Sequence, residues 1–249
     1  MSTDSQHVDG ILDDYRNLAL RWNRQINLVS RQDTADRLDN LILQCRNSWD
    51  RLIGSDTGGL TNPARLWYFD LGSGGGFPGV VWHVQMMAAK IPVTTFLVEP
   101  REKRAWFLER VALQVGPDAL HVINNRWEEA LKDGWEKPNL SVRPSHVLIS
   151  LKALKLSDAK VLRGLSPFLE AGNVVDAAEE DRPTIVIARF HPPDQEWNPG
   201  LAGELGIPSA GHLHATPSCI FRSEGGRILG PATLPGASLV LSEYRIQAP

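Results

Sequence analysis

One stretch of the sequence decides the fold, and it reads LWYFDLGSGGGFPG over residues 66–79. Its first six positions are apolar apart from Asp70, which is typical of a strand buried inside a sheet. Three glycines follow directly, Gly72, Gly74 and Gly76, and glycine lets the chain turn tightly and approach a ligand closely. A helix after this loop would point its first amides at the bound group. The segment therefore predicts a strand, a ligand-binding loop and a helix in succession.

Downstream of the loop, short apolar runs alternate with segments of helical spacing. The predicted strands cover 93–99, 121–124 and 146–151, and the predicted helices cover 80–89, 102–115, 127–131 and 157–165. Such alternation indicates a Rossmann-like α/β fold, in which a mostly parallel sheet carries helices on both faces. Ligands bind these sheets beyond the carboxyl ends of the strands. After residue 172 the pattern weakens, and only 184–188 and 238–244 are predicted as strands.

Two amphipathic helices precede the α/β pattern. Apolar residues recur at helical spacing from residue 11 to about 28, and again up to about 53. The stretch 54–63 is rich in Gly, Thr, Asn and Asp, which is typical of a linker. We therefore expect a helical N-terminal extension, residues 1–62, followed by an α/β domain over residues 63–249.

The composition is that of a soluble globular protein, with 42% hydrophobic and 22% charged residues among 249. The net charge of -3 shows no global basic field, although a whole-chain sum hides any basic face. Cys45 and Cys219 are too few for a disulfide framework, and His212 and His214 have no further ligand at suitable spacing, so no metal is expected. A polar N-terminus and the lack of a long apolar run predict a cytoplasmic protein without a membrane span.

The glycine loop alone does not choose its ligand, because residues 74–79 also fit the dinucleotide pattern G-x-G-x-x-G. Two residues favour S-adenosylmethionine. Asp70 can face the cationic amino group of this methyl donor, and it would repel a pyrophosphate. Pro78 removes an amide donor from what would be a phosphate cradle. Glu99, at the end of the second strand, can accept hydrogen bonds from both ribose hydroxyls.

Five motifs resemble the RsmG (GidB) family over roughly residues 11 to 172. They are Tyr15 to Ser30 with Trp22-Asn23 and Asn27-Leu28; Asp70-Leu71-Gly72-Ser73-Gly74-Gly75-Gly76-Phe77-Pro78-Gly79; Leu97-Val98-Glu99-Pro100 with Lys103-Arg104-Ala105-Trp106-Phe107-Leu108; Arg126-Trp127-Glu128; and Ser150-Leu151-Lys152-Ala153-Leu154. In the last motif Lys152 stands where the family has arginine. The G-F-P-G extension together with the K-R-x-x-F-L pattern is more specific than a bare glycine loop.

This resemblance implies a class I S-adenosylmethionine-dependent methyltransferase that modifies N7 of a guanine in bacterial 16S ribosomal RNA. Residues 63–249 would then form the methyltransferase domain. The implied donor contacts are Asp70, Gly72, Ser73, Gly74, Gly76, Phe77, Glu99, Arg126, Trp127 and Glu128. The implied RNA contacts are Lys103, Arg104 and Lys152, with Lys152 as the catalytic residue that touches a phosphate or O6. Because N7 carries a lone pair and no proton, alignment and charge stabilisation are expected instead of a general base.

The chain departs from the family pattern on the acceptor side. The family has an R-H-x-x-D-S-L motif after its first helices, whereas no histidine precedes Asp39-Asn40-Leu41 in any nearby register. The lysine expected after Gly172 and the basic, proline-rich tail are also absent. Three alternatives therefore stay open: a methyltransferase with a small-molecule or protein acceptor, a non-catalytic RNA-binding relative, and a nicotinamide-dependent oxidoreductase on the same glycine pattern.

Overall fold

The computed structural model describes residues 3–54, 60, 63–130, 144–152, 154–171, 181–191, 210–215, 220–229 and 238–247. Most of the predicted linker, the stretch after Gly172 where the family has its lysine, and Cys219 lie outside these ranges. No helix in the described ranges combines the length and the apolar character needed to cross a membrane.

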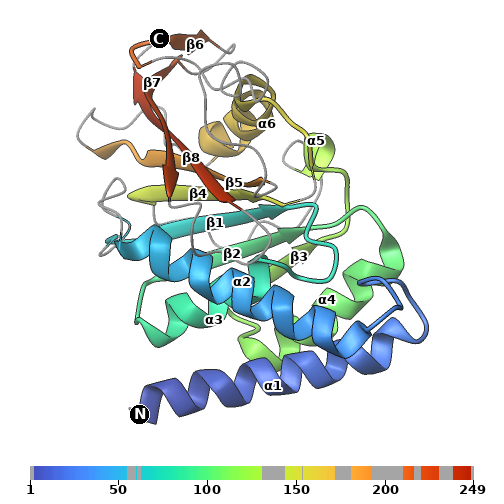
Figure 1. Ribbon diagram of the computed structural model, residues 1–249. Coiled ribbons are helices and arrows are strands. Elements are labelled where there is room, and N and C mark those ends of the chain that lie inside the picture. The colour runs from blue at the N-terminus through green and yellow to red at the C-terminus, as the bar shows by residue number, and fades with distance from the viewer. Residues whose placement is uncertain are drawn as a thin grey trace.

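The elements follow the predicted alternation closely (Figure 1). The helices are α1 (Thr3–Asn23), α2 (Thr34–Gly54), α3 (Gly79–Ala88), α4 (Glu102–Val115), α5 (Trp127–Ala130) and α6 (Asp158–Ala171). The strands are β1 (Leu66–Leu71), β2 (Val93–Val98), β3 (Leu120–Ile123), β4 (His146–Leu151), β5 (Thr184–His191), β6 (Leu213–Ala215), β7 (Ile220–Leu229) and β8 (Ser238–Gln247). Strands β6 and β7 were not predicted, because they fall in the Gly- and Pro-rich part of the sequence.

The first helix ends earlier than its apolar spacing predicts. The side-chain oxygen of Asn23 accepts the backbone amides of Leu28 and Val29, at 2.8 and 3.0 Å. These bonds hold the chain in a turn, because an Asn side chain offers the backbone an alternative to continuing the helix. The apolar residues after Asn23, up to position 28, therefore lie in a turn beyond the helix, and the Asn23 side chain has a structural role there.

All eight strands form one sheet in the order β3-β2-β1-β4-β5-β8-β7-β6. Strands β1 to β5 are parallel, with β1 in the middle between β2 and β4. Strand β8 runs antiparallel to both β5 and β7, and β6 closes the far edge. The order reverses at β1 and β4, so the carboxyl ends of these two strands flank a topological switch point, where open α/β sheets bind ligands.

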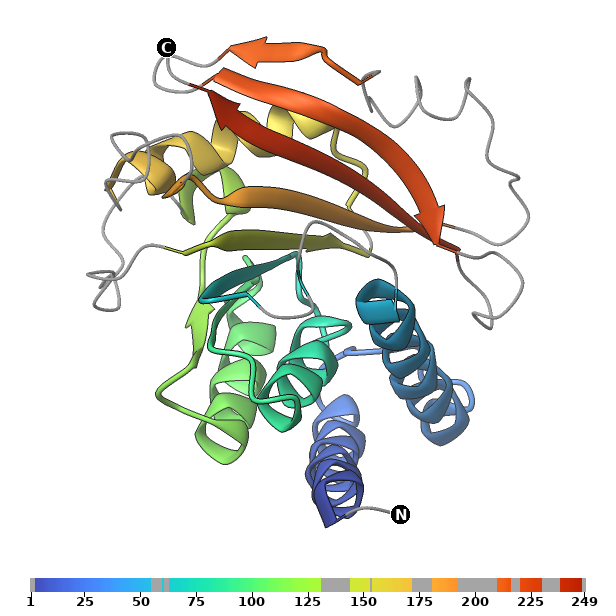
Figure 2. The ribbon, with the colours of Figure 1, turned by 90° about the vertical axis from the view of Figure 1, so that its left-hand side faces the viewer.

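Helices cover both faces of the sheet, as predicted. Seen edge-on, α1 to α4 lie below the sheet, and α5 and α6 lie above it (Figure 2). One buried cluster joins α1, α2 and α3 to the lower face, and a second joins α5 and α6 to the upper face. The N-terminal helices thus share a core with the sheet, and the proposed boundary at residues 62–63 stays a prediction.

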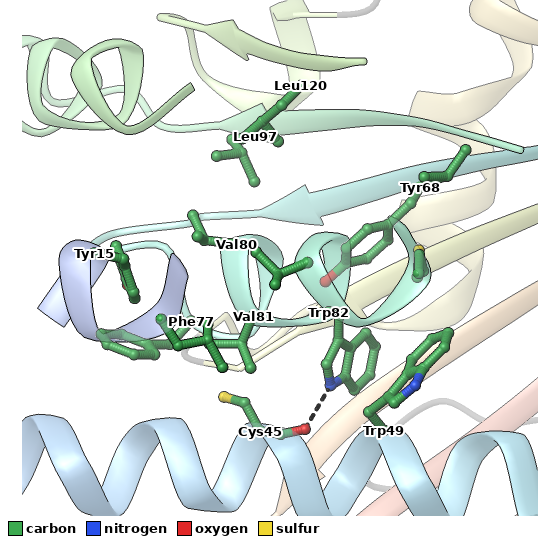
Figure 3. Close-up of a cluster of buried hydrophobic side chains, with 14 of the residues drawn as sticks. Tyr15, Cys45, Trp49, Tyr68, Phe77, Val80, Val81, Trp82, Leu97 and Leu120 are labelled. Carbon is green, nitrogen blue, oxygen red and sulfur yellow. Dashed lines mark hydrogen bonds between the residues drawn. The ribbon is translucent and has the colours of Figure 1, made fainter. Parts of the chain in front are cut away.

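Trp82 of α3 is the centre of the lower core (Figure 3). Its ring lies between Tyr68 of β1 and Trp49 of α2, with centroid distances of 5.7 and 6.3 Å. Its indole Nε1 donates to the carbonyl of Cys45 at 2.9 Å and to Ser48 at 3.1 Å. The tryptophan therefore buries a large apolar surface while its one polar group stays satisfied, and it fastens α2 onto the sheet.

Gly164 of α6 gives a direct test of the upper core. A Cβ at this position would lie 2.3 Å from the Trp127 ring, whereas a Cβ on Gly10 of α1 would meet nothing within 4 Å. Gly→Ala gains up to about 1 kcal/mol of helix propensity at either site, but overpacking costs about 1–3 kcal/mol. We expect Gly164→Ala to lower the free energy of unfolding in urea and Gly10→Ala to raise it. Equal shifts in both variants would contradict the packing.

His83 of α3 predicts a loss of stability in mild acid. Its side chain is buried with Nδ1 2.9 Å from Thr95 Oγ1, and burial, assisted by the charge of His121, lowers its pKa to about 4. Below pH 6.5 the unfolded chain therefore binds a proton that the folded chain refuses, and stability falls as the pH drops from 6.5 toward 4. We expect the unfolding free energy of wild type, relative to that of His83→Gln, to fall by about 2 kcal/mol from pH 7 to pH 5. Urea titrations that give a pH-independent difference would exclude this origin.

Candidate functional site at the carboxyl edge of the sheet

The loop after β1 has the backbone shape that only glycine adopts readily. Gly72, Gly74 and Gly76 have φ values of +74°, +57° and +93°. The amide of Gly72 donates to the carbonyl of Val98 at 2.9 Å, which attaches the loop to the end of β2. A Cβ at Gly76 would lie 2.7 Å from Val80, so larger residues are excluded there by contact as well as by conformation. The predicted tight turn is confirmed.

Asp70 fastens three elements together below the loop. Its carboxylate accepts hydrogen bonds from Ser150 of β4 at 2.5 Å and from the first amide of α3, Gly79, at 3.2 Å. The side chain is only 1% exposed, and burial raises its pKa to about 6 although these hydrogen bonds act in the opposite direction. A Cβ on Gly79 would lie 2.5 Å from this carboxylate, which is why glycine stands there. The contact of Asp70 with a donor amino group stays a prediction.

Glu99 holds the loop from the side of β2. One carboxylate oxygen accepts the amide of Gly74 at 2.8 Å, and the other accepts the amide of Arg101 at 2.9 Å. Each carboxylate oxygen has two lone pairs, so each keeps one acceptor position for a ligand hydroxyl. The side chain of Asn124 donates to the Glu99 carbonyl at 2.9 Å, which joins the ends of β2 and β3.

A cleft of about 670 Å³ lies beside the loop, within the range of small-molecule and cofactor sites. Among the residues that line it are Gly72, Arg101, Asn125, Arg126, Trp127 and Leu154. The apolar side chains and the few polar groups come from the carboxyl ends of β1 to β4. The cleft therefore occupies the position that the strand order predicts for a ligand.

The predicted Arg126-Trp127-Glu128 motif reaches this cleft. All three residues line it, with Arg126 exposed at its rim. Trp127 is 7% exposed and packs into the upper core, so it serves as both wall and core residue. Glu128 forms a surface ion pair with Lys160 at 3.4 Å, and the Lys160 ammonium also lies over the Trp127 ring at 5.6 Å.

Two further predicted donor contacts are internal to the protein. The Ser73 hydroxyl donates to the Asp70 carbonyl at 2.8 Å. Phe77 is buried with its ring 5.5 Å from that of Tyr15, and the Tyr15 hydroxyl donates to the Gly75 carbonyl. These contacts brace the loop from α1, and donor contacts of Ser73 and Phe77 stay predictions.

Lys152 follows β4 and faces α2. Its ammonium donates to the side-chain oxygen of Gln44 and lies 4.8 Å from the centre of the Phe190 ring. It also attracts the carboxylate of Asp70. The residue is thus a cation held at the carboxyl end of β4, beside the switch point, and its contact with RNA stays a prediction.

The predicted RNA contacts do not share one environment. Lys103 is exposed on α4, while Arg104 on the same helix is partly buried and donates to the Asn27 carbonyl at 2.6 Å. Lys152 instead contacts α2, as described above. Each of these three cations therefore has its own surroundings.

A buried polar cluster was missed by the sequence analysis. Arg189 of β5 forms an ion pair with Asp158, and Tyr244 of β8 donates to the same carboxylate. Burial raises the pKa of Tyr244, so its hydroxyl keeps the proton that it donates. Arg189 also donates to the Leu156 carbonyl at 3.1 Å, and Leu156 lines the cleft. The sequence placed Asp158 only at the start of the predicted helix 157–165, and nothing in the spacing indicated partners in distant strands.

No group of three or more His, Cys, Asp or Glu side chains within the described ranges is arranged to hold a metal ion. The other missed residues are Arg101, Asn124 and Asn125, which line the cleft. The signal for the two asparagines was available, because they follow a predicted strand at the edge where ligands bind.

The strand order, the five parallel strands and the glycine loop define the Rossmann-like fold of class I S-adenosylmethionine-dependent methyltransferases. The sequence model of the GidB family, described as rRNA small subunit methyltransferase G, matches residues 10–143. The chain belongs to this family.

Curated relatives and solved structures match parts of the chain. The ribosomal RNA small subunit methyltransferase G of Rhodopseudomonas palustris is 38% identical over 121 residues, which are 48% of this chain and 46% of that protein. The protein of the same name from Ruegeria pomeroyi is 34% identical over 117 residues, 46% of this chain and 50% of that protein. The chain thus spans about half the length of the curated relatives that it matches. A solved structure of an MtNAS mutant in complex with S-adenosylmethionine has a TM-score of 0.48 at 12% identity, covering 100% of this chain and 80% of that one.

The raised pKa of Asp70 predicts that its charge costs stability near neutral pH. The folded pKa of about 6 lies above the ordinary value of 3.8, so the folded state is favoured most below pH 3.8 and loses this contribution as the pH rises through 6. We expect the unfolding free energy of wild type, relative to Asp70→Asn, to fall by about 1 kcal/mol from pH 5 to 8. Denaturation in urea measures this difference. Asp14→Asn, at an exposed position, is the control for the loss of a formal charge. A rising difference would refute the assignment.

Proposed function

We propose that this protein transfers a methyl group from S-adenosylmethionine to N7 of a guanine in the small-subunit ribosomal RNA of its cell, in the cytoplasm. The observation that carries this proposal is the cleft beside Gly72, which opens at the switch point and is lined by Val98 and Pro100, the chain neighbours of Glu99. Membership of the GidB family supports both the donor and the acceptor class.

The residues at the cleft fit the methyl donor. An adenosine needs an apolar wall and a few polar partners, and Trp127, Leu154 and Asn125 supply both. The ribose would be held by Glu99, whose carboxylate stands at the loop with an acceptor position left on each oxygen. A Cβ on Gly72 would lie 3.0 Å from the Leu154 side chain. Glycine at position 72 therefore leaves room for Leu154 in the wall of the cleft.

The chemistry asks little of the protein beyond alignment. S-adenosylmethionine supplies an electrophilic methyl group, and guanine N7 offers a lone pair without a proton. The protein has to hold the two reactants in line, and good orientation alone is worth up to about 7–11 kcal/mol. In this reading Lys152 positions the acceptor through a phosphate or O6, which suits a cation fixed by Gln44 at the end of β4.

One family feature on the acceptor side, the aspartate of the motif after the first helices, has a partner within this chain. Asp39, which stands where the family motif has its aspartate, pairs with Arg16 of α1. That pair joins α1 to α2, and the acceptor contacts in this proposal are Lys103, Arg104 and Lys152. The acceptor is therefore tested separately from the donor.

The donor is tested by calorimetry with S-adenosylmethionine, S-adenosylhomocysteine and NAD. We expect wild type to bind the first two, and Glu99→Gln to weaken both roughly tenfold or more, because the ribose loses a charged acceptor. Glu102→Gln makes the same change on the exposed side of α4 and should bind as wild type does. Binding of NAD alone would instead support an oxidoreductase.

The acceptor is tested by mass spectrometry of small-subunit rRNA from a deletion strain. Loss of one 7-methylguanosine, restored by the wild-type gene and reduced with Lys152→Met, is the expected result. An unchanged rRNA in the deletion strain, with donor binding intact, would replace RNA by a small-molecule or protein acceptor.

A further inference from the structure

A second hollow adjoins the glycine loop, away from the residues that line the cleft. It measures about 540 Å³ and is formed by the connection between α1 and α2 together with α4, which lie side by side (Figure 1). Its described lining residues are Asn27, Leu28, Val29, Ser30, Arg31 and Arg104. Two of these six are cations and none is an acid, so the hollow has a net positive lining.

Arg104 lies between this hollow and the glycine loop. Its Nη2 donates to the Asn27 carbonyl at 2.6 Å, and its Nη1 lies 3.7 Å from the point where a Cβ on Gly74 would sit. The Asn27 carbonyl therefore holds the guanidinium in place, and Nη1 lies beside Gly74, which has no side chain. A guanidinium has five N–H donors, so most of its hydrogen-bonding capacity is not used by Asn27.

Neither cation of this hollow forms an ion pair within the described ranges. Within the described ranges, neither Arg31 nor Arg104 has a carboxylate at ion-pair distance, and Arg31 donates only to the side-chain oxygen of Asn27 at 3.0 Å. Burial and the charge of Arg101 lower the pKa of Arg104, while Glu99 raises it. An anion in the hollow would relieve the repulsion and form charge-assisted hydrogen bonds with Arg104.

We propose that Arg104 and Arg31 form a subsite for an anionic oxygen group, next to Gly74. Two ligands of the proposed reaction carry such a group: the amino-acid end of the methyl donor has a carboxylate, and the RNA has phosphates. The inference rests on the proposed function, since that function supplies both ligands. It places Arg104 beside the glycine loop, whereas the family motif grouped this residue with Lys103 as an RNA contact.

The test compares Arg104→Gln with Arg110→Gln, which makes the same change at an exposed position six residues further along α4. Glutamine keeps an amide that can still donate to the Asn27 carbonyl, and thermal melts confirm that both variants are folded. Three probes are used: S-adenosylhomocysteine, 5′-methylthioadenosine, which lacks the amino-acid end, and a small-subunit rRNA hairpin titrated at several salt concentrations.

Two outcomes support the subsite and identify its source. If the group is the donor carboxylate, Arg104→Gln weakens S-adenosylhomocysteine roughly tenfold and leaves methylthioadenosine unchanged. If it is an RNA phosphate, both nucleosides bind as in wild type, and the slope of log affinity against log salt falls by about one.

Two other outcomes separate the failure of each idea. If Arg104→Gln matches Arg110→Gln with every probe, the subsite does not exist, and the proposed function is unaffected. If wild type binds neither nucleoside, the methyl-donor proposal fails, and the RNA hairpin alone then decides whether the hollow binds an anion.

Discussion

The structure depends on one carboxylate that is shut away from water. Asp70 lies where β1 meets the glycine loop, and its oxygens bind a hydroxyl of β4 and the first amide of α3. Desolvation works against the charge, as the pKa of about 6 shows, while the N-terminus of α3 favours it. The buried charge of Asp70 thus lowers the stability of the fold, while its hydrogen bonds fix β1, β4 and α3 relative to one another.

Two elements that are far apart in the sequence hold the glycine loop. Glu99 binds its backbone from β2, and Tyr15 binds it from α1. Gln44 of α2 contacts Lys152 at the end of β4. The N-terminal helices therefore take part in shaping the site, because each of them touches a segment at the carboxyl edge of the sheet.

The parallel half of the fold could be predicted because its strands have continuous apolar runs and its loop has an unmistakable glycine pattern. The bounds 66–71, 102–115 and 146–151 match the structure for this reason. Strands β6 and β7 could not be predicted, because glycine and proline in that part of the sequence mask the periodicity of a strand. For the site, motif spacing located Glu99 and Arg126 but gave no indication that Asp158, Arg189 and Tyr244 meet, because tertiary contacts between distant segments leave no local signal. The same limit grouped Lys103 with Arg104, which lie next to each other in sequence but in different surroundings.

The outermost strands of the described sheet are also its shortest. Strand β3 has four residues and β6 has three, whereas β7 and β8, which lie between β6 and the centre of the sheet, have ten each. An unpaired strand edge is a template on which another chain can add a strand, and a brief edge offers few amide and carbonyl groups for that purpose. At the high concentrations of an expression host, the brevity of β3 and β6 thus limits how many backbone groups these two strands offer for intermolecular pairing.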